Sequence, residues 1–253
     1  MGKVKAKKVP QVLFAGDSAA DGAARYLLGV LSTLNVRVTH LAPWEKIDSR
    51  QYKQKYDAFI LSDYPRAQLS AKAEAWIAKA VEQGAGFMMI GGWASFSGPF
   101  GGYRSSRLEK LLPVQCLKRD DRLNFPGGAH LYREQAHPIF SGLSFSQVPA
   151  IVGMNEIIPK AQSSVLLSAK KMVQIGSNVT YDPCHYPLLV IDARPALRTA
   201  ALTTDLAPHW CGGLVDWGPK TKKIKMPKGV EIEVGTLYIR FASALIRWII
   251  GRI

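Results

Sequence analysis

The chain has 253 residues, of which 47% are hydrophobic, and a formal net charge of +14 at pH 7. A chain of this length and apolar content can bury a substantial core, so we expect a folded globular protein. The three cysteines, Cys116, Cys184 and Cys211, are odd in number and widely separated. This pattern excludes a disulfide framework and a zinc ribbon.

The first half of the chain alternates short apolar runs with segments of helical periodicity. The runs predict strands at 11–18, 36–41, 56–63 and 87–90, and the periodic segments predict helices at 21–34 and 70–82. Strands separated by helices are typical of parallel sheets, because parallel neighbours need crossover connections. We therefore predict an α/β fold with a mostly parallel sheet covered by helices.

The second half has a different texture. A short helix is predicted around 105–112, and residues 113–190 are expected to form a β-rich elaboration with short strands at 165–167 and 187–191. A strand at 199–202 and a final helix at about 234–249 complete the prediction. No domain linker is visible, so residues 10–253 are predicted to be one domain that follows a flexible basic tail at 1–9.

No segment of the chain predicts export or membrane insertion. The basic start, Met1 to Lys8, is not followed by an apolar signal core. The most apolar window, 241–250, contains Arg247 and is shorter than the roughly 20 residues that a membrane helix needs. We expect a cytoplasmic protein without membrane contact.

Much of the positive charge lies in two lysine clusters. They consist of Lys3, Lys5, Lys7 and Lys8, and of Lys220, Lys222, Lys223, Lys225 and Lys228. Neither cluster has interleaved aromatic residues on which bases could stack. We favour a solvated tail and loop, while a module that binds nucleic acid or another polyanion stays open as an alternative. A homo-oligomer is expected only because soluble proteins often form one.

Polar residues follow several predicted strands, and the carboxyl ends of parallel strands meet at one edge, where ligands bind. The stretch 86–103 is the clearest example, because its apolar strand leads into a glycine-rich, aromatic turn. The predicted ligand-binding residues are Asp17, Ser18, Asp63, Gly91, Gly92, Trp93, Ser95, Phe96, Tyr103, Asp205 and His209.

The sequence predicts the position of this site more clearly than its chemistry. The turn matches neither a phosphate-binding nor a dinucleotide-binding glycine motif, and we predict no cofactor. Ser95 is a candidate nucleophile with His209 as its base and Asp205 as the acid, although the favoured role of Ser95 is to cap the turn. Asp205, His209 and Cys211 have suitable ligand types but no recognisable metal spacing, so no metal is predicted.

Eight ordered blocks of the sequence resemble one family. They are Ile60-Leu-Ser-Asp63, Met89-Ile-Gly-Gly-Trp-Ala-Ser-Phe-Ser-Gly98 with Gly102-Tyr103, Leu111-Leu-Pro-Val114, Asp120-Asp-Arg122, His137-Pro-Ile139 with Gly142-Leu143, Gly153-Met-Asn155 with Pro159-Lys160, Thr204 to Trp210, and Trp217. Together they resemble the glutamine amidotransferase-like family of uncharacterised cytoplasmic proteins. The resemblance implies a flavodoxin-like three-layer sandwich of the class I glutamine amidotransferase superfamily.

Enzymes of this superfamily use a cysteine on the turn after a central strand, assisted by a histidine and an acid. Here that turn holds Gly92, Trp93, Ala94 and Ser95, so attack by a thiolate cannot be carried over. Our leading hypothesis is a protein that binds a small polar ligand at the sheet edge. The alternative enzyme is a hydrolase or amidase that uses Ser95 or a water activated by His209.

Overall fold

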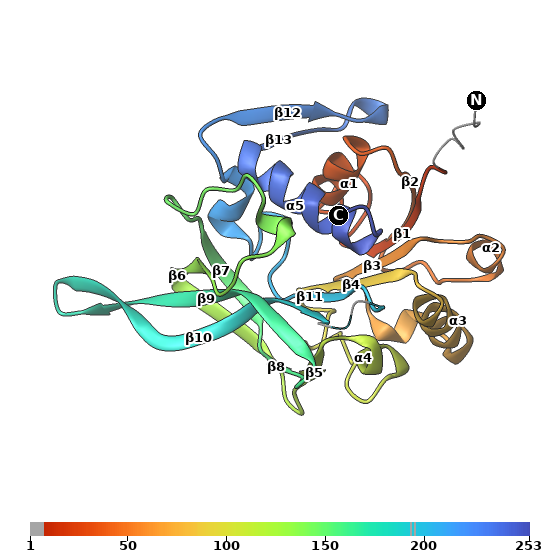
Figure 1. Cartoon of the computed structure of the whole chain (residues 1–253), viewed down its shortest axis with the longest axis horizontal. Helices are drawn as coiled ribbons and strands as arrows, with labels where there is room; N and C mark the ends of the chain where they lie inside the picture. Colours follow the sequence, from red (N-terminus) through yellow and green to blue (C-terminus); the bar gives the residue numbers. More distant parts are fainter. Residues whose placement is uncertain (1–7, 193, 195) are drawn as a thin grey trace, which may run out of the picture.

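The computed structural model describes residues 8–192, 194 and 196–253, so most of the predicted basic tail lies outside the described residues. Its main sheet has nine strands (Figure 1). In spatial order they are β2 (Arg37–Leu41), β1 (Gln11–Gly16), β3 (Ala58–Ser62), β4 (Gly86–Ile90), β11 (Thr199–Leu202), β10 (Asn178–Asp192), β9 (Ser163–Ile175), β6 (Arg122–Arg133) and β7 (Ala150–Asn155).

The first five strands in this order are parallel to one another. The strands β3 and β4 are buried along their whole length, which explains their continuous apolar sequences. The helix α3 (Ala71–Glu82) lies between them in sequence and is capped by the Ser70 side chain, which accepts a hydrogen bond from Ala73 N–H. These elements confirm the predicted α/β order of the first half.

The remaining four strands are antiparallel to their neighbours, so the sheet is mixed rather than mostly parallel. The strands β9 and β10 follow each other across only Gly176 and Ser177. A connection this short permits only antiparallel pairing. The predicted β-rich elaboration therefore extends the parallel sheet sideways from β11.

The hairpin β9–β10 is much longer than the sequence predicts. Its strands have 13 and 15 residues, whereas only 165–167 and 187–191 were expected. Figure 1 shows the hairpin projecting from the rest of the molecule. Its distal residues are exposed, for example Ile175 and Val179. Apolar and polar residues alternate there, at 173–175 and 179–182, but neither face of this part of the hairpin is buried.

Helices cover both faces of the parallel half. Side chains alternate along β1, so Val12 and Phe14 pack into one core with α1 (Arg25–Ser32) and α5 (Thr236–Ile249). Leu13 and Ala15 point the opposite way, into a core with α3 and α4 (Arg107–Leu111). A further short helix, α2 (Ser49–Tyr52), was not predicted.

The second lysine cluster forms a β-hairpin instead of the expected loop. Its strands are β12 (Thr221–Lys225) and β13 (Glu231–Gly235), and α5 therefore begins at Thr236 rather than at Val234. Lys223 lies 3.7 Å from both Glu231 and Glu233 across the hairpin. Another small sheet pairs β5 (Val114–Cys116) with β8 (Ile157–Pro159).

The helices of residues 8–192, 194 and 196–253 have at most 14 residues. None of them combines the length and the apolar character needed to cross a bilayer.

Candidate functional site

Four loops meet at the carboxyl edge of the parallel sheet. They follow the adjacent strands β1, β3, β4 and β11, and begin at Asp17, Asp63, Gly91 and Thr203. The sequence-predicted site residues all belong to these loops. The order of the strands brings the four loops side by side, although they are far apart in sequence.

The loops after β1 and β3 are joined by a close backbone crossing. A side chain on Gly16 would place its Cβ 1.6 Å from Ser62 O, so only glycine is accommodated there. Asp17 N–H donates to Ser62 O at 2.8 Å, and the Ser62 hydroxyl donates to Asp17 Oδ1 at 2.7 Å. Asp17 has φ 64°, a left-handed conformation that most residues avoid. The crossing therefore fixes the Asp17 carboxyl at the sheet edge.

Asp63 is fixed in a similar way against the loop after β4. Its φ is 48°, again left-handed. Its Oδ1 accepts a hydrogen bond from Ala94 N–H, and its own N–H donates to Ser95 Oγ at 3.1 Å. Because strained backbone persists only where surrounding contacts demand it, its presence at two neighbouring aspartates marks this edge as a specialised region.

The Ser95 hydroxyl is fully used by these contacts. It is 1% exposed, donates to Ile90 O at 2.5 Å and accepts from Asp63 N–H. Among the hydrogen bonds of the described residues, none joins Ser95 to His209. The observed role of Ser95 is to hold the turn, as expected for a capping residue.

Gly91 and Gly92 give the turn after β4 its close contacts with two other elements. Gly91 N–H donates to Leu202 O at 2.8 Å and to Thr204 O at 3.1 Å. A Cβ on Gly91 would lie 2.0 Å from Thr203 O, and one on Gly92 would lie 2.6 Å from Asp63 Cγ. Both glycines are therefore required by packing, not by ligand approach alone.

The turn has a second support that the sequence reasoning missed. Asn155, at the end of β7, accepts from Gly92 N–H at 2.9 Å through Oδ1, and its Nδ2 donates to Gly92 O at 3.2 Å and to Asp121 Oδ1 at 2.7 Å. The other Asp121 oxygen accepts from Ser97 N–H at 2.6 Å. Asn155 and Asp121 lie inside two of the blocks that carry the family resemblance, which was the one available signal.

Burial raises the pKa of Asp121 to about 6, although the hydrogen bonds from Asn155 and Ser97 lower it. This carboxyl lies beneath the turn and is fully buried. Its position identifies it as a support for the turn, since its oxygens are both taken up by protein donors.

The loop after β11 supplies an acid and a histidine. Asp205 is buried, and its Oδ1 accepts from Ala207 N–H at 2.7 Å. Its Oδ2 lies 3.7 Å from Nδ1 of His209, whose side chain is 79% exposed. This distance indicates an ion pair rather than a hydrogen bond. Contact with Asp205 raises the pKa of His209, although partial burial lowers it.

The aspartates at this edge influence one another. Burial and then repulsion from Asp205 raise the pKa of Asp17 well above its ordinary value. Burial also raises the pKa of Asp63, where the hydrogen bond from Ala94 lowers it and repulsion from Asp205 raises it further. The three carboxyls therefore form one electrostatically coupled group. We call Asp17, Asp63 and Asp205 the aspartate cluster.

Trp93 is one of two exposed aromatic residues of the turn, the other being Phe100. The Trp93 side chain is 51% exposed, and the Arg122 guanidinium lies over its ring, 4.2 Å from the ring centre. Arg122 is held in turn by Asp120, with its Nη2 2.6 Å from Oδ2. The indole is thus fixed on one face by a cation at a surface position.

Two predicted ligand-binding residues face elsewhere, and a third, Ser18, bonds locally. Phe96 and Tyr103 are completely buried in the core beneath the turn, and Tyr103 OH donates to Tyr64 O at 2.6 Å. The turn folds back over them, so they support it instead of lining its surface. The Ser18 hydroxyl donates to the adjacent Ala19 O at 3.2 Å.

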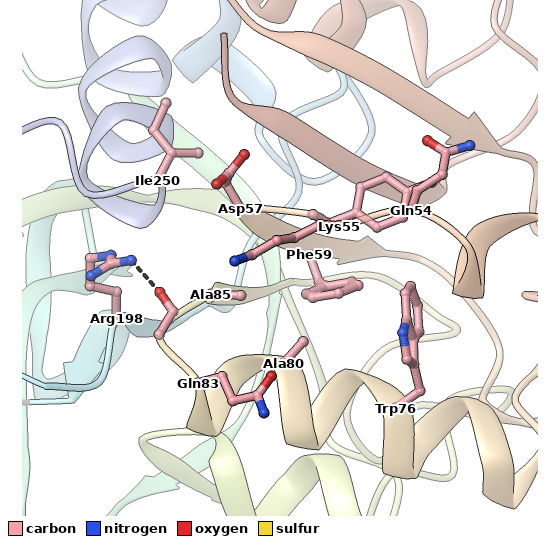
Figure 2. A pocket seen from close by; sticks show the side chains of 12 residues that line it. Gln54, Lys55, Asp57, Phe59, Trp76, Ala80, Gln83, Ala85, Arg198 and Ile250 are labelled. Atoms are coloured by element: carbon pink, nitrogen blue, oxygen red, sulfur yellow. Dashed lines mark hydrogen bonds between the residues drawn. The ribbon is translucent and has the colours of Figure 1, made fainter. Parts of the chain in front are cut away.

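Two hollows near the parallel sheet do not include the aspartate cluster. One, of about 660 Å³, lies beside the turn between the segments 65–69 and 99–102. Another, of about 400 Å³, lies at the opposite edge near the start of β3 and is shown in Figure 2. There Arg198 donates to Gly84 O and Ile249 O, so it clamps the starts of the strands to α5.

The aspartate cluster and His209 do not form a metal site. Among the side chains of residues 8–192, 194 and 196–253, no three His, Cys, Asp or Glu residues are grouped so that they could hold a metal ion. The aspartate cluster and His209 therefore present acids and a base without a metal-binding geometry.

Comparisons with known proteins agree with this architecture. The family described as "Putative glutamine amidotransferase" matches residues 14–225. Cytoplasmic protein STM1381 of Salmonella typhimurium LT2 is 25% identical, with a TM-score of 0.63, over 80% of this chain and 91% of that protein. Cytoplasmic protein STM3548 of Salmonella typhimurium is 24% identical, with the same TM-score and coverage.

A ThuA-like protein of Parabacteroides merdae has a similar fold, with a TM-score of 0.56 and 12% identity over 97% of this chain and 92% of that protein. No curated protein is similar enough in sequence to count as a match. The family match extends from β1 to β12 and so includes all four loops of the sheet edge. With most of its length matched, the chain belongs to the putative glutamine amidotransferase family.

Proposed function

We propose that this family member binds a small polar ligand at the carboxyl edge of the sheet and does not perform thiolate chemistry. The observation that carries the proposal is the aspartate cluster beside the exposed Trp93. Where the resemblance would place a cysteine, the turn has Gly92, Trp93, Ala94 and Ser95. Binding therefore requires fewer assumptions than amide hydrolysis.

The hydrogen bonds of the cluster define what the ligand must offer. One oxygen of each aspartate accepts a hydrogen bond from the protein, from Ser62 Oγ, Ala94 N–H and Ala207 N–H respectively. The second oxygen of each makes no hydrogen bond to a described residue. A ligand with amino or hydroxyl groups would supply the missing donors, and Trp93 would contact its apolar part.

A panel of amino acids, amines and simple sugars tests this proposal by ligand-observed NMR. For any compound that binds, Trp93→Ala and Asp205→Asn should each weaken binding about tenfold or more, the effect of losing roughly 1.4 kcal/mol. Trp44→Ala is the matched control, because Trp44 is 65% exposed and lies outside the four loops. Unchanged affinity in both site variants would show that binding occurs elsewhere.

The Asp205–His209 pair favours a second candidate, a hydrolase or amidase in which His209 activates a water. Asp205 lies beside His209 and raises its pKa, which makes the exposed imidazole a stronger base toward a water molecule. Ester and amide hydrolysis should then depend on pH near the His209 pKa and be lost in His209→Ala. Equal hydrolysis by wild type and His209→Ala would eliminate this candidate.

The architecture supports two further proposals. Residues 10–253 fold as one domain, because β6, β7, β9 and β10 join the same sheet as β1 and β4, while β5 and β8 form a small sheet of their own. The fold is a flavodoxin-like three-layer sandwich in its parallel half, where helices contribute to two separate cores. A cytoplasmic location is proposed by analogy with the two Salmonella proteins.

A further inference from the structure

A separate cavity lies beside the outer edge of the sheet, where Ala20 and Asp21 of the loop after β1 contribute to its lining. It has a volume of about 720 Å³ and is lined mainly by α1, the edge strand β2 and the tip of the β12–β13 hairpin. The hairpin crosses α1 closely, since a Cβ on Gly29 would lie 2.4 Å from Ile232 Cδ1. The cavity therefore lies where the hairpin spans the outer end of the core.

The interior of this cavity is aliphatic. Leu28 lines it from α1, and Leu34 and Val36 line it from the segment between α1 and β2. Val38 lines it from β2, and Met226 lines it from the hairpin. All five side chains pack against the core and are only partly buried. They leave apolar surface that the protein itself does not cover.

The mouth of the cavity carries Lys228 in a costly conformation. Lys228 and Gly229 have φ 64° and 74°, both left-handed, and Met226 N–H donates to Val230 O at 2.8 Å, so the hairpin reverses over the three residues Pro227, Lys228 and Gly229. Asn or Gly would adopt the first of these positions with less strain. Lys228 lines the cavity beside Pro227 and Val230, so it brings a cationic side chain to an otherwise largely apolar lining.

The charge around the mouth favours anions. The hairpin carries five lysines (Lys220, Lys222, Lys223, Lys225 and Lys228) against two glutamates (Glu231 and Glu233). Both glutamates lie beside Lys223, on the outward face. Lys228 has no acidic partner among the ion pairs of the described residues, although Asp21 also lines the cavity.

From the aliphatic interior and the cationic mouth, we infer that this cavity binds an unbranched alkyl carboxylate, with its chain between α1 and β2 and its carboxylate at Lys228. The site is independent of the aspartate cluster, since the two share no lining residue. Apolar burial supplies most of the affinity, and Lys228 sets the preference for an anionic head.

Titration calorimetry with hexanoate, octanoate and decanoate, below their micelle concentrations, tests this inference. The Kd should fall about fourfold for each methylene that enters the cavity, which corresponds to about 0.8 kcal/mol. Decan-1-ol, which has the same chain without the charge, should bind several-fold more weakly than decanoate. Affinity that is independent of chain length would overturn the inference.

Variants assign the binding to this cavity. Lys228→Gln should weaken decanoate binding several-fold and leave decan-1-ol unchanged, whereas Lys223→Gln, the matched control, should change neither. Leu28→Gln should weaken both ligands, and the milder Val36→Thr provides the same test if Leu28→Gln does not fold. Binding that survives Lys228→Gln and Val36→Thr unchanged would place the carboxylate elsewhere and refute the site. Binding of the protein to anionic lipid vesicles without binding to free decanoate would also refute the site.

Discussion

The Arg122 guanidinium lies 4.2 Å from the centre of the Trp93 ring, so the turn after β4 and the start of β6 contact each other at the surface. Asp120 holds Arg122 from the other side. The exposed indole is therefore held by a chain of contacts from the antiparallel half of the sheet. This contact connects the two halves of the fold at the candidate site.

Arg122→Ala should free the Trp93 side chain while costing only about 0.5–1 kcal/mol of stability, the usual value of an exposed cation–π contact. The indole N–H resonance of Trp93, assigned with Trp93→Phe, should shift and sharpen. Arg119→Ala is the control, because Arg119 pairs with Glu156 instead. An indole resonance that does not respond to Arg122→Ala would contradict the contact.

Asp17→Asn should stabilise the protein at pH 7. Burial and repulsion from Asp205 raise the Asp17 pKa in the folded state, so the fold is favoured while this group is protonated, and that contribution is lost as the pH rises through the folded-state pKa. Asparagine keeps an acceptor for Ser62 and tolerates left-handed φ. We therefore expect Asp17→Asn to have a higher free energy of unfolding than the wild type at pH 7.

Urea unfolding at pH 7 and pH 4 measures this gain. It should be large at pH 7 and shrink toward pH 4, as the wild-type carboxyl becomes protonated. The exposed Asp216→Asn should show no comparable gain. A destabilised Asp17→Asn protein at pH 7 would mean that the charge is compensated by a contact not identified above.

Asn155→Ala should destabilise the turn by about 2–4 kcal/mol, because it leaves Gly92 N–H without its acceptor and removes a donor from the buried Asp121 carboxyl. The Asp121 pKa of about 6 makes the loss depend on pH. Above pH 6 the ionised carboxylate needs the Asn155 donor more, so the loss should be greater at pH 8 than at pH 5. Unfolding at both pH values, with the exposed Asn124→Ala as control, provides the measurement.

His209 should titrate above the ordinary pKa of histidine, about 6.5. Its attraction to Asp205 stabilises the fold at low pH, and this small contribution disappears as the pH rises through the His209 pKa. NMR titration of the imidazole Cε1–H group should show the raised pKa, and Asp205→Asn should lower it. His137, whose pKa is lowered by burial, is the internal comparison. A His209 pKa that does not move in Asp205→Asn would refute the pairing.

Gly91→Ala should prevent normal folding or cost more than about 3 kcal/mol. Its Cβ would lie 2.0 Å from the backbone oxygen of Thr203, which cannot move without disturbing β11. Gly84→Ala is the comparison, because no atom lies within 4 Å of its Cβ and only the strain of its φ of 101° remains. Similar stability of the two variants would show that the β4–β11 contact yields easily.

The strands that frame the candidate site were predictable because short apolar runs end in Gly, Ser or Asp. The runs that end at Asp63 and Gly91 gave correct strand positions, and a parallel sheet places their ends at one edge. Ser70 likewise predicted the start of α3. Local patterns were sufficient wherever burial on both faces imposed a strong apolar signal.

The same patterns could not show contacts that depend on the order of strands in space. Asn155 lies at the end of β7, which is the last strand in the spatial order of the sheet. Its side chain nevertheless bonds to Gly92 in the turn after β4. Nothing local distinguished the buried Phe96 from the exposed Trp93, since both are aromatic residues in one glycine-rich turn. The full length of the β9–β10 hairpin escaped prediction because its alternating stretches, 173–175 and 179–182, are short and carry no buried apolar run.

The pairing of β4 with β11 has a consequence for how the protein is made. Gly91 N–H is bonded to Leu202 O and Thr204 O, so the turn is complete only after the chain from Gly92 to Ala201 has closed as a loop. Contacts over such a separation form late, because the entropy of loop closure must be spent first. During synthesis, β1, β3 and β4 can pair while Asp205 has not yet been added. The binding edge is therefore expected to form only after β11 has been made, and a chain truncated before β11 would be folded in part but without a site.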